Sequence, residues 1–242
     1  VEQLVNGDKP IDNETLGKSS VVVRGLSAYE YILFDSKPDI ATPEQKARYC
    51  PLLVAIGEHQ KVLAEEILKG WNSTDGMLSQ MTKFPNQRYA DSHEAIADLL
   101  RAQVTALDTL KKKLGAPMGR QSKGIAQPLQ AEAWRSHSSM KSLEASLKAA
   151  QAVWVGVDNR GLRGLLGKDQ SALADKIDAA YANALKLLAA NDKPLGELLA
   201  DDAGKQTLND IYDSLNVVHR LHEGDLAKAL NIQLGFNAND GD

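Results

Sequence analysis

The stretch TPEQKARYCPLLVAIGEHQKVLAEEILKG, residues 42–70, predicts one long amphipathic helix. Thr42 is a good N-cap residue, Pro43 suits the first helical position, and Gln45 stands where a capping box requires it. The apolar residues that share one helical stripe are Leu52, Ile56, Leu63 and Ile67. A helix with one apolar stripe must bury that stripe against neighbouring elements, so the stretch favours a fold of packed helices.

Helical spacing of apolar residues continues through most of the 242-residue chain. Ala and Leu, both strong helix formers, are abundant, and no alternating pattern of strand length appears. The predicted helices cover about residues 16–35, 42–70, 91–115, 128–155, 171–190 and 202–230, with a short helix starting at Pro194. We therefore expect an all-α fold with essentially no sheet, built as two helical bundle units, residues 1–115 and 116–242.

The composition is that of an ordinary globular protein, with 43% hydrophobic and 25% charged residues. A net charge of −4 gives no argument for a nucleic-acid or anionic-membrane partner. The single cysteine, Cys50, excludes an intramolecular disulfide, and no apolar run is long enough for a transmembrane helix. The chain starts at Val1 without an initiator Met or a signal peptide, as a processed product would.

The predicted helix over residues 16–35 is apolar on nearly every side, which is typical of a buried helix. Glu30 lies in its middle, and a buried carboxylate must be paired, protonated or bound to a metal. Ser27 lies one turn earlier on the same face, and Arg24 a turn before that. Both a binding role for Glu30 and a structural pairing with an arginine are consistent with this pattern.

Three segments resemble signatures of the imelysin family: RGLSAYEY at residues 24–31, EAWRSHS at 132–138 and the tail GFNANDGD at 235–242. The resemblance covers about residues 19–242 and implies helical bundles. It implies two function classes, a metallopeptidase or a periplasmic or outer-membrane protein of bacterial iron uptake. It also implies further helices before Val1, so the first unit is expected to lack N-terminal helices, and any lipid anchor would lie there.

The family's metal motif, Gly-x-His-x-x-Glu, is only partly matched, because Gly25 and Glu30 fit but Ser27 replaces the histidine. In the family, the histidine and glutamate are the proposed metal ligands. Serine is a poor ligand for a transition metal, so the replacement argues against peptidase activity. His59 and His137 lie on predicted apolar stripes, where each could meet Glu30 at a metal or be a satisfied core residue.

Arg135 is a natural partner for Glu30, because a guanidinium can bind a carboxylate through two hydrogen bonds. Glu30, Arg135 and Ser27 could hold an anion, a carboxylate or a hydrated ion, or could form a closed structural network. The candidate ligand-binding residues are Ser27, Glu30, Arg135, Glu132 and Arg24, and the candidate metal ligands are Glu30, His137 and His59.

His219 and His222 are three residues apart on the last predicted helix, a spacing that can place two imidazoles on one metal. The zincin pattern His-Glu-x-x-His is absent, and no further ligands stand at zincin spacing. The pattern therefore favours an ordinary solvated or half-buried helix end over a metal site.

The resemblance, with Ser27 in place of the motif histidine, implies a binding protein of bacterial iron uptake in the periplasm or at the outer membrane. The ligand candidates are iron or another divalent metal, with haem as a further alternative. The expected partners are iron-uptake or electron-transfer proteins of the cell envelope, with no nucleic acid and no transmembrane segment in this chain. The alternatives are an imelysin-type metallopeptidase and a structural or partner-docking bundle without a ligand.

Overall fold

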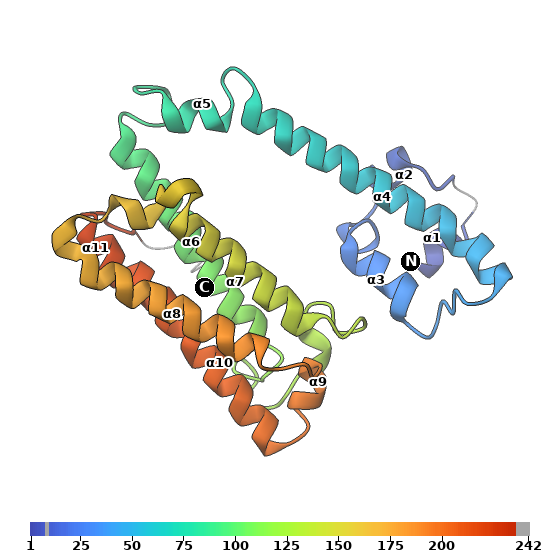
Figure 1. Ribbon diagram of the computed structural model, residues 1–242. Coiled ribbons are helices and arrows are strands. Elements are labelled where there is room, and N and C mark those ends of the chain that lie inside the picture. Colours follow the sequence, from blue (N-terminus) through green and yellow to red (C-terminus); the bar gives the residue numbers. More distant parts are fainter. Residues whose placement is uncertain (8–9, 236–242) are drawn as a thin grey trace. The chain divides into compact units, whose positions relative to one another are not determined.

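The computed structural model describes residues 1–7 and 10–235, which form helices, turns and loops without any strand (Figure 1). This confirms the predicted all-α fold. The chain divides into two compact units, Val1–Ala90 and Asp91–Asp242, called here the first and second units. The tail signature lies almost wholly in residues 236–242, outside the described residues.

The first unit is organised around one long helix, α4, which contacts each of the other α-helices of that unit. The bounds are α1 (Glu2–Val5), α2 (Asn13–Gly17), a 3-10 helix (Val21–Val23), α3 (Leu26–Phe34), α4 (Pro43–Asn72) and α5 (Met77–Thr82). The predicted start of α4 is confirmed, since the Thr42 hydroxyl accepts a hydrogen bond from the Gln45 amide at 3.3 Å.

The helix predicted over residues 16–35 is wrong as a single element, because the structure breaks it into α2, the 3-10 helix and α3. Three consecutive β-branched valines between two glycines disfavour a continuous helix there. The predicted burial on all sides is also wrong, since Leu26 is 72% and Phe34 57% exposed. A nine-residue helix packed on one partner buries a single stripe, which here consists of Ala28 and Ile32.

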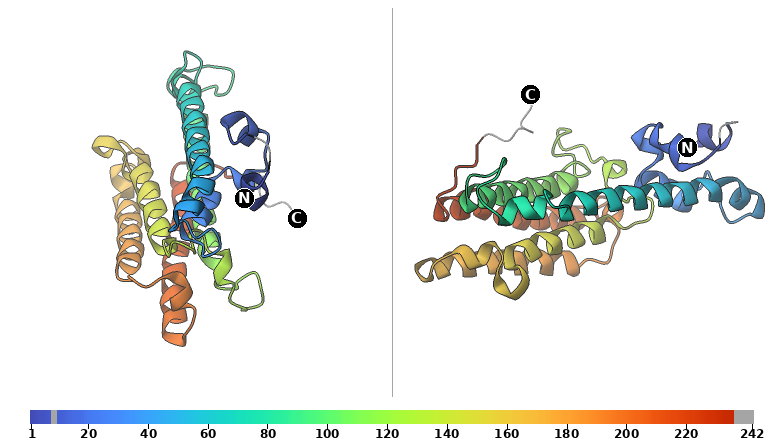
Figure 2. Two further views of the ribbon diagram at one scale, coloured as in Figure 1. Left: turned by 90° about the vertical axis from the view of Figure 1, so that its right-hand side faces the viewer. Right: turned by 90° about the horizontal axis from the view of Figure 1, so that it is seen from above.

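The apolar stripe of α4 is buried along only part of its length. Leu52 and Ile56 belong to the core of the first unit, where α1, α2 and α3 gather on the N-terminal half of α4 (Figure 2). Leu63 and Ile67 continue the stripe but are 39% and 63% exposed. Periodicity therefore predicted the face of the helix correctly and did not predict which turns of it are covered.

The second unit is a four-helix bundle in which each helix packs on two neighbours, in the cyclic order α6, α7, α8, α10 (Figure 1). Its helices are α6 (Ser92–Gly115), α7 (Ser139–Val155), α8 (Ser171–Ala189), α9 (Leu195–Leu198), α10 (Asp202–Arg220) and α11 (Ala227–Ala229). Short 3-10 helices span Pro128–Gln130, Val157–Asn159, Leu162–Leu165 and Lys168–Gln170, and a π-helical segment spans Leu221–Leu226. Aliphatic side chains from all four long helices fill one continuous core.

One unit boundary and one helix boundary differ from the predicted ones. Helix α6, which that analysis placed before a division at residue 115, packs on α7 and α10 within the second unit. Helix α7 begins at Ser139, so the predicted helix over residues 128–155 is wrong in its first part. Ala133 and His137 have positive φ angles of 54° and 56°, which an α-helix does not accommodate.

A substitution of Gly204 should test how closely α9 and the start of α10 pack. A Cβ atom on Gly204 would lie 2.2 Å from the carbonyl oxygen of Leu198, so backbone must shift to accept it. We expect Gly204→Ala to lower the free energy of unfolding by about 1–3 kcal/mol in urea titrations. Gly196→Ala is the control, because its Cβ meets no described atom within 4 Å and should leave stability unchanged or slightly raised. Equal effects of the two substitutions would contradict the close approach.

Candidate functional site

The motif segment of the first unit lies at the start of α3. Gly25 is the N-cap residue, Ser27 is exposed in the first turn, and Glu30 is half-buried where a buried carboxylate was expected. Arg24 donates a hydrogen bond to the carbonyl of Gly17, and its own carbonyl accepts one from the side chain of Gln60 at 2.9 Å. In this structure, Arg24 therefore ties the motif segment to α2 and α4.

His59, a candidate metal ligand, is buried in the first unit with a hydrogen-bond partner. Its Nδ1 lies 2.8 Å from the side-chain oxygen of Asn13 on α2. Because an amide oxygen only accepts, Nδ1 must donate this hydrogen bond. The bond links α4 to α2, which is the structural alternative that the sequence analysis left open for this histidine.

The other predicted site residues occupy the turns before α7 in the second unit. Glu132 is exposed and pairs with Lys113 at 2.8 Å, and the Arg135 guanidinium lies 4.3 Å from the ring centre of Trp134. His137 is exposed in a turn, so its predicted place on an apolar helix face is wrong. Glu30 belongs to the first unit, and its predicted meeting with these side chains stays a prediction.

A tyrosine-bound carboxylate in the first unit was not predicted from the sequence. The hydroxyl of Tyr49 shares its one hydrogen between the two carboxylate oxygens of Glu2, each at 2.7 Å, and that of Tyr31 donates to one of them at 3.0 Å. These bonds, that of Tyr49 above all, lower the pKa of Glu2. Burial and the nearby carboxylate raise the pKa of Tyr31 to about 12. The three side chains join α1, α3 and α4 and hold the motif helix in place.

The core of the second unit contains a chain of hydrogen bonds that ends at His222. The Gln103 amide donates to the carbonyl of Ala150 at 2.7 Å and to the hydroxyl of Tyr181 at 3.0 Å. Nδ1 of His222 lies 2.9 Å from the carbonyl of Val218, which can only accept, so Nδ1 carries the proton. Nε2 must then accept from the Tyr181 hydroxyl, at 3.3 Å. Every bond in the chain has one possible direction.

His222 is fully buried between aromatic rings. The rings of Trp154 and Tyr181 meet it edge-on, with centroids 5.6 and 5.5 Å away. Trp154 donates to Asp178 at 2.7 Å, and Arg163 pairs with the same carboxylate at 2.8 Å. Burial lowers the pKa of His222 to about 4, so the ring is neutral at neutral pH.

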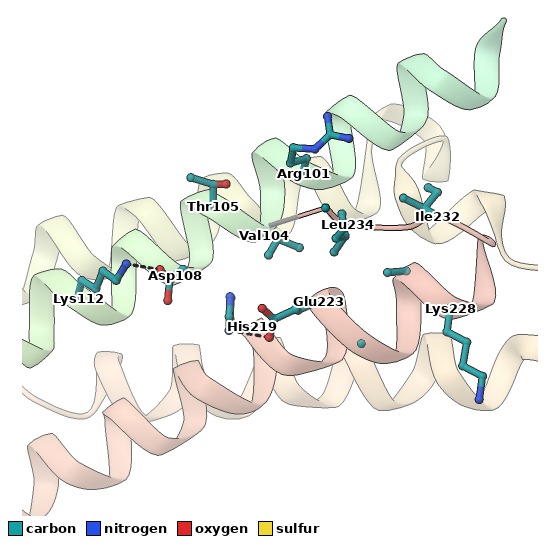
Figure 3. Close-up of a pocket in the computed structure, with 13 residues that line it drawn as sticks. Arg101, Val104, Thr105, Asp108, Lys112, His219, Glu223, Lys228, Ile232 and Leu234 are labelled. Atoms are coloured by element: carbon teal, nitrogen blue, oxygen red, sulfur yellow. Dashed lines mark ion pairs between the residues drawn. The ribbon is translucent and has the colours of Figure 1, made fainter. Parts of the chain in front are cut away.

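A cavity of about 660 Å³ lies on the other side of α10, between that helix, α6 and the segment after α11 (Figure 3). Its wall has a polar part and an apolar part. The polar side chains are Arg101, Thr105, Asp108, Lys112, His219, Glu223 and Lys228, and the apolar ones are Val104, Ala227, Ile232 and Leu234. The π-helical segment contributes Glu223 and Gly224 to this wall; such segments are frequent at functional sites.

Lys111 fixes the protonation state of His219, the histidine of the cavity wall. Its buried ammonium group lies 3.0 Å from Nδ1 of His219, 3.2 Å from the Asn216 side-chain oxygen and 3.3 Å from the Asp108 carboxylate. An ammonium group only donates, so Nδ1 accepts and the ring proton is on Nε2. Burial, and then the charge of Lys111, lowers the pKa of His219, which favours the neutral ring.

Asp108 is the carboxylate that balances the buried lysine. Burial alone would raise its pKa, but hydrogen bonds from Lys112 and Lys111 outweigh this and hold the pKa below its usual value. Glu223 lies 3.9 Å from Nδ1 of His219. Within residues 1–7 and 10–235, no three His, Cys, Asp or Glu side chains gather in a way that could hold a metal ion.

A family model described as imelysin matches residues 1–222, which include the motif segment of α3, the turns before α7 and both histidines of α10 and its π-helical extension. The chain belongs to the imelysin family. No curated protein and no solved structure matches this imelysin-family chain. None of its described helices is both long enough and apolar enough to cross a membrane.

The burial of His222 should make the stability of the second unit depend on pH. Between pH 6.5 and about 4, His222 is protonated in the unfolded protein but stays neutral in the folded protein. The free energy of unfolding therefore has its full value above pH 6.5. It decreases as the pH falls from 6.5 to about 4, by about 3 kcal/mol in all. His222→Gln keeps an amide donor and acceptor but does not titrate, so we expect a shallower loss.

Urea unfolding at stepped pH measures this difference. The exposed His93 provides the matched control, and His93→Gln should unfold with the pH dependence of the wild type. A His222→Gln variant whose stability falls as steeply as that of the wild type would show that His222 is not the buried neutral base described above.

Proposed function

We propose that this imelysin-family protein serves bacterial iron uptake at the cell envelope and that it binds its ligand without catalysis. The observation that carries the proposal is Ser27, which stands exposed on α3 where the family motif has its histidine. A metallopeptidase needs a firmly held metal, an open coordination position and a general base. A serine hydroxyl in place of an imidazole weakens the first of these requirements.

The donors that remain in the motif segment suit a particular kind of metal. Ser27 and Glu30 offer oxygen atoms, and oxygen ligands favour hard cations over the softer metals that imidazole and thiolate select. Ferric iron is a hard cation, so the Glu30 carboxylate is the donor proposed to bind it. Arg24, on the same segment, is the further residue proposed to contact the ligand.

The proposed setting is the periplasm or the outer membrane, since the family resemblance implies exported bacterial proteins. Iron-uptake or electron-transfer proteins of the envelope are the proposed partners. Nothing in the charge of the chain favours nucleic acid, because the net charge is −4 without a basic excess.

Iron binding through Glu30 can be measured on protein purified without a chelator. After dialysis against ferric citrate, we expect the wild type to retain iron above a buffer blank in elemental analysis, and Glu30→Ala to retain at least tenfold less. The thermal melting point should change little, because a half-buried carboxylate kept for binding contributes little to stability. We also expect no cleavage of a protein substrate that chelation stops and zinc restores.

Ser27→His completes the motif and serves as the gain-of-function control. It should bind zinc at least tenfold more tightly than the wild type, because imidazole is the better ligand for this metal. Ser73→His, an exposed site after α4, should leave zinc binding unchanged. Equal iron retention by the wild type and Glu30→Ala would contradict the binding proposal, whereas chelator-sensitive proteolysis by the wild type would favour the metallopeptidase.

A further inference from the structure

The cavity beside His219 lies within the second unit and contains none of the motif residues. We propose that it binds a small neutral alcohol with an apolar body, whose hydroxyl group accepts a hydrogen bond from His219 and donates one to Glu223. The proposal is independent of iron binding, because it rests only on α6, α10 and the segment after them. Figure 3 shows His219 on α10 facing α6, with Asp108 on α6 and Glu223 on the next turn near it.

Nε2 of His219 is the hydrogen-bond donor of the cavity. The side chain is only 7% exposed, and Lys111 donates to Nδ1 at 3.0 Å, so Nε2 carries a hydrogen and can only donate. Nε2 makes no hydrogen bond within residues 1–7 and 10–235. It is not sealed in the core either, because in that part of the chain the side-chain oxygen of Gln45 is the one fully buried polar side-chain atom without a partner. The donor is therefore open to the cavity and lacks an acceptor.

The carboxylate of Glu223 is the matching hydrogen-bond acceptor. Its Oε2 lies 3.9 Å from Nδ1 of His219, and that nitrogen has a lone pair and no hydrogen to give. Among the residues that the structure describes, no cation pairs with Glu223. Because residues four apart share one face of a helix, His219 and Glu223 can contact the same ligand atom. A hydroxyl group both accepts and donates, so it satisfies the two side chains together.

The charges next to His219 balance, and this favours a neutral ligand group. Lys111 and Lys112 both pair with Asp108, at 3.3 and 2.8 Å, and Glu223 supplies a second negative charge. Two ammonium groups therefore stand against two carboxylates. A carboxylate on the ligand would be repelled by Asp108 and Glu223, and an ammonium group would have no acceptor to offer Nε2.

The two other cations that line the cavity do not change this balance. Arg101 forms an ion pair with Asp98 on its own helix. Lys228 is exposed, and Figure 3 shows its side chain extending away from His219. Neither cation therefore adds a positive charge beside the proposed position of the hydroxyl group.

The rest of the cavity wall determines the body of the ligand. Val104 and Ile232 are buried, Leu234 is half-buried, and all three line the end away from Lys112. An aliphatic or aromatic body can bury its surface there. A volume of about 660 Å³ is in the range of sites that enclose small organic molecules. An apolar end and a polar end orient an alcohol in one direction.

Titration of the isotopically labelled full chain with four probes, followed by amide shifts in NMR, separates the head group from the body. Hexan-1-ol and pentyl methyl ether contain the same atoms, but the ether accepts without donating; hexanoate and hexylamine carry opposite charges at neutral pH. We expect saturable binding of hexan-1-ol at millimolar concentration, the ether about tenfold weaker, and both ions weaker still. The ether or an ion binding as tightly as the alcohol, or no saturable binding of the alcohol, would overturn the proposal.

Variants locate the binding in this cavity. Glu223→Met keeps the length of an exposed side chain without its acceptor, so the preference for hexan-1-ol over the ether should disappear. Glu66→Met, the same change at an exposed position of α4, should keep the preference. Leu234→Trp fills the apolar end without touching Lys111 or His219 and should weaken both probes at least fivefold. A folded Glu223→Met protein that still prefers the alcohol, or a folded Leu234→Trp protein with wild-type affinity, would contradict the assignment.

Discussion

The second unit depends on the hydrogen bonds of two buried histidines, His219 near the end of α10 and His222 in the π-helical segment after it. His222 faces the bundle core and is held by Val218 on its own helix and Tyr181 on α8. His219 faces the cavity and is held by Lys111 on α6. A buried polar group without a partner costs free energy, so these bonds favour one alignment of α6, α8 and α10.

The same bonds give the two histidines opposite protonation patterns. The proton of His222 is on Nδ1, because a carbonyl oxygen faces that atom, whereas the proton of His219 is on Nε2, because an ammonium group faces its Nδ1. The His222 ring is thereby part of the core, and the His219 ring, in the wall of the cavity, carries its proton on Nε2. The π-helical segment directly after α10 carries His222 into the core and Glu223 to the cavity wall.

Periodicity in the sequence predicted the faces of the long helices well, because burial on a bundle follows the helical repeat. His222 follows the same helical repeat, because it continues the buried stripe formed by Leu208, Ile211, Leu215 and Val218. The sequence pattern favoured a solvated or half-buried helix end for this histidine, and that prediction is wrong because His222 is fully buried. It also missed the role of Lys111, since a lysine buried by contacts from α10 has no signature in its own helix. The break between α2 and α3 was not predicted, because the prediction followed the apolar character of the stretch and not the low helix propensity of its valines and glycines.

The central claim is that Lys111 holds His219 neutral with its proton on Nε2. Long-range proton–nitrogen correlation by NMR, on protein labelled at its histidine nitrogens, reads the protonation of each ring nitrogen directly, and His219→Phe assigns the signals by their loss. At neutral pH the account predicts a bare Nδ1 and a protonated Nε2 for His219, and the opposite pattern for His222. A His219 ring protonated on Nδ1, or on both nitrogens, would contradict it.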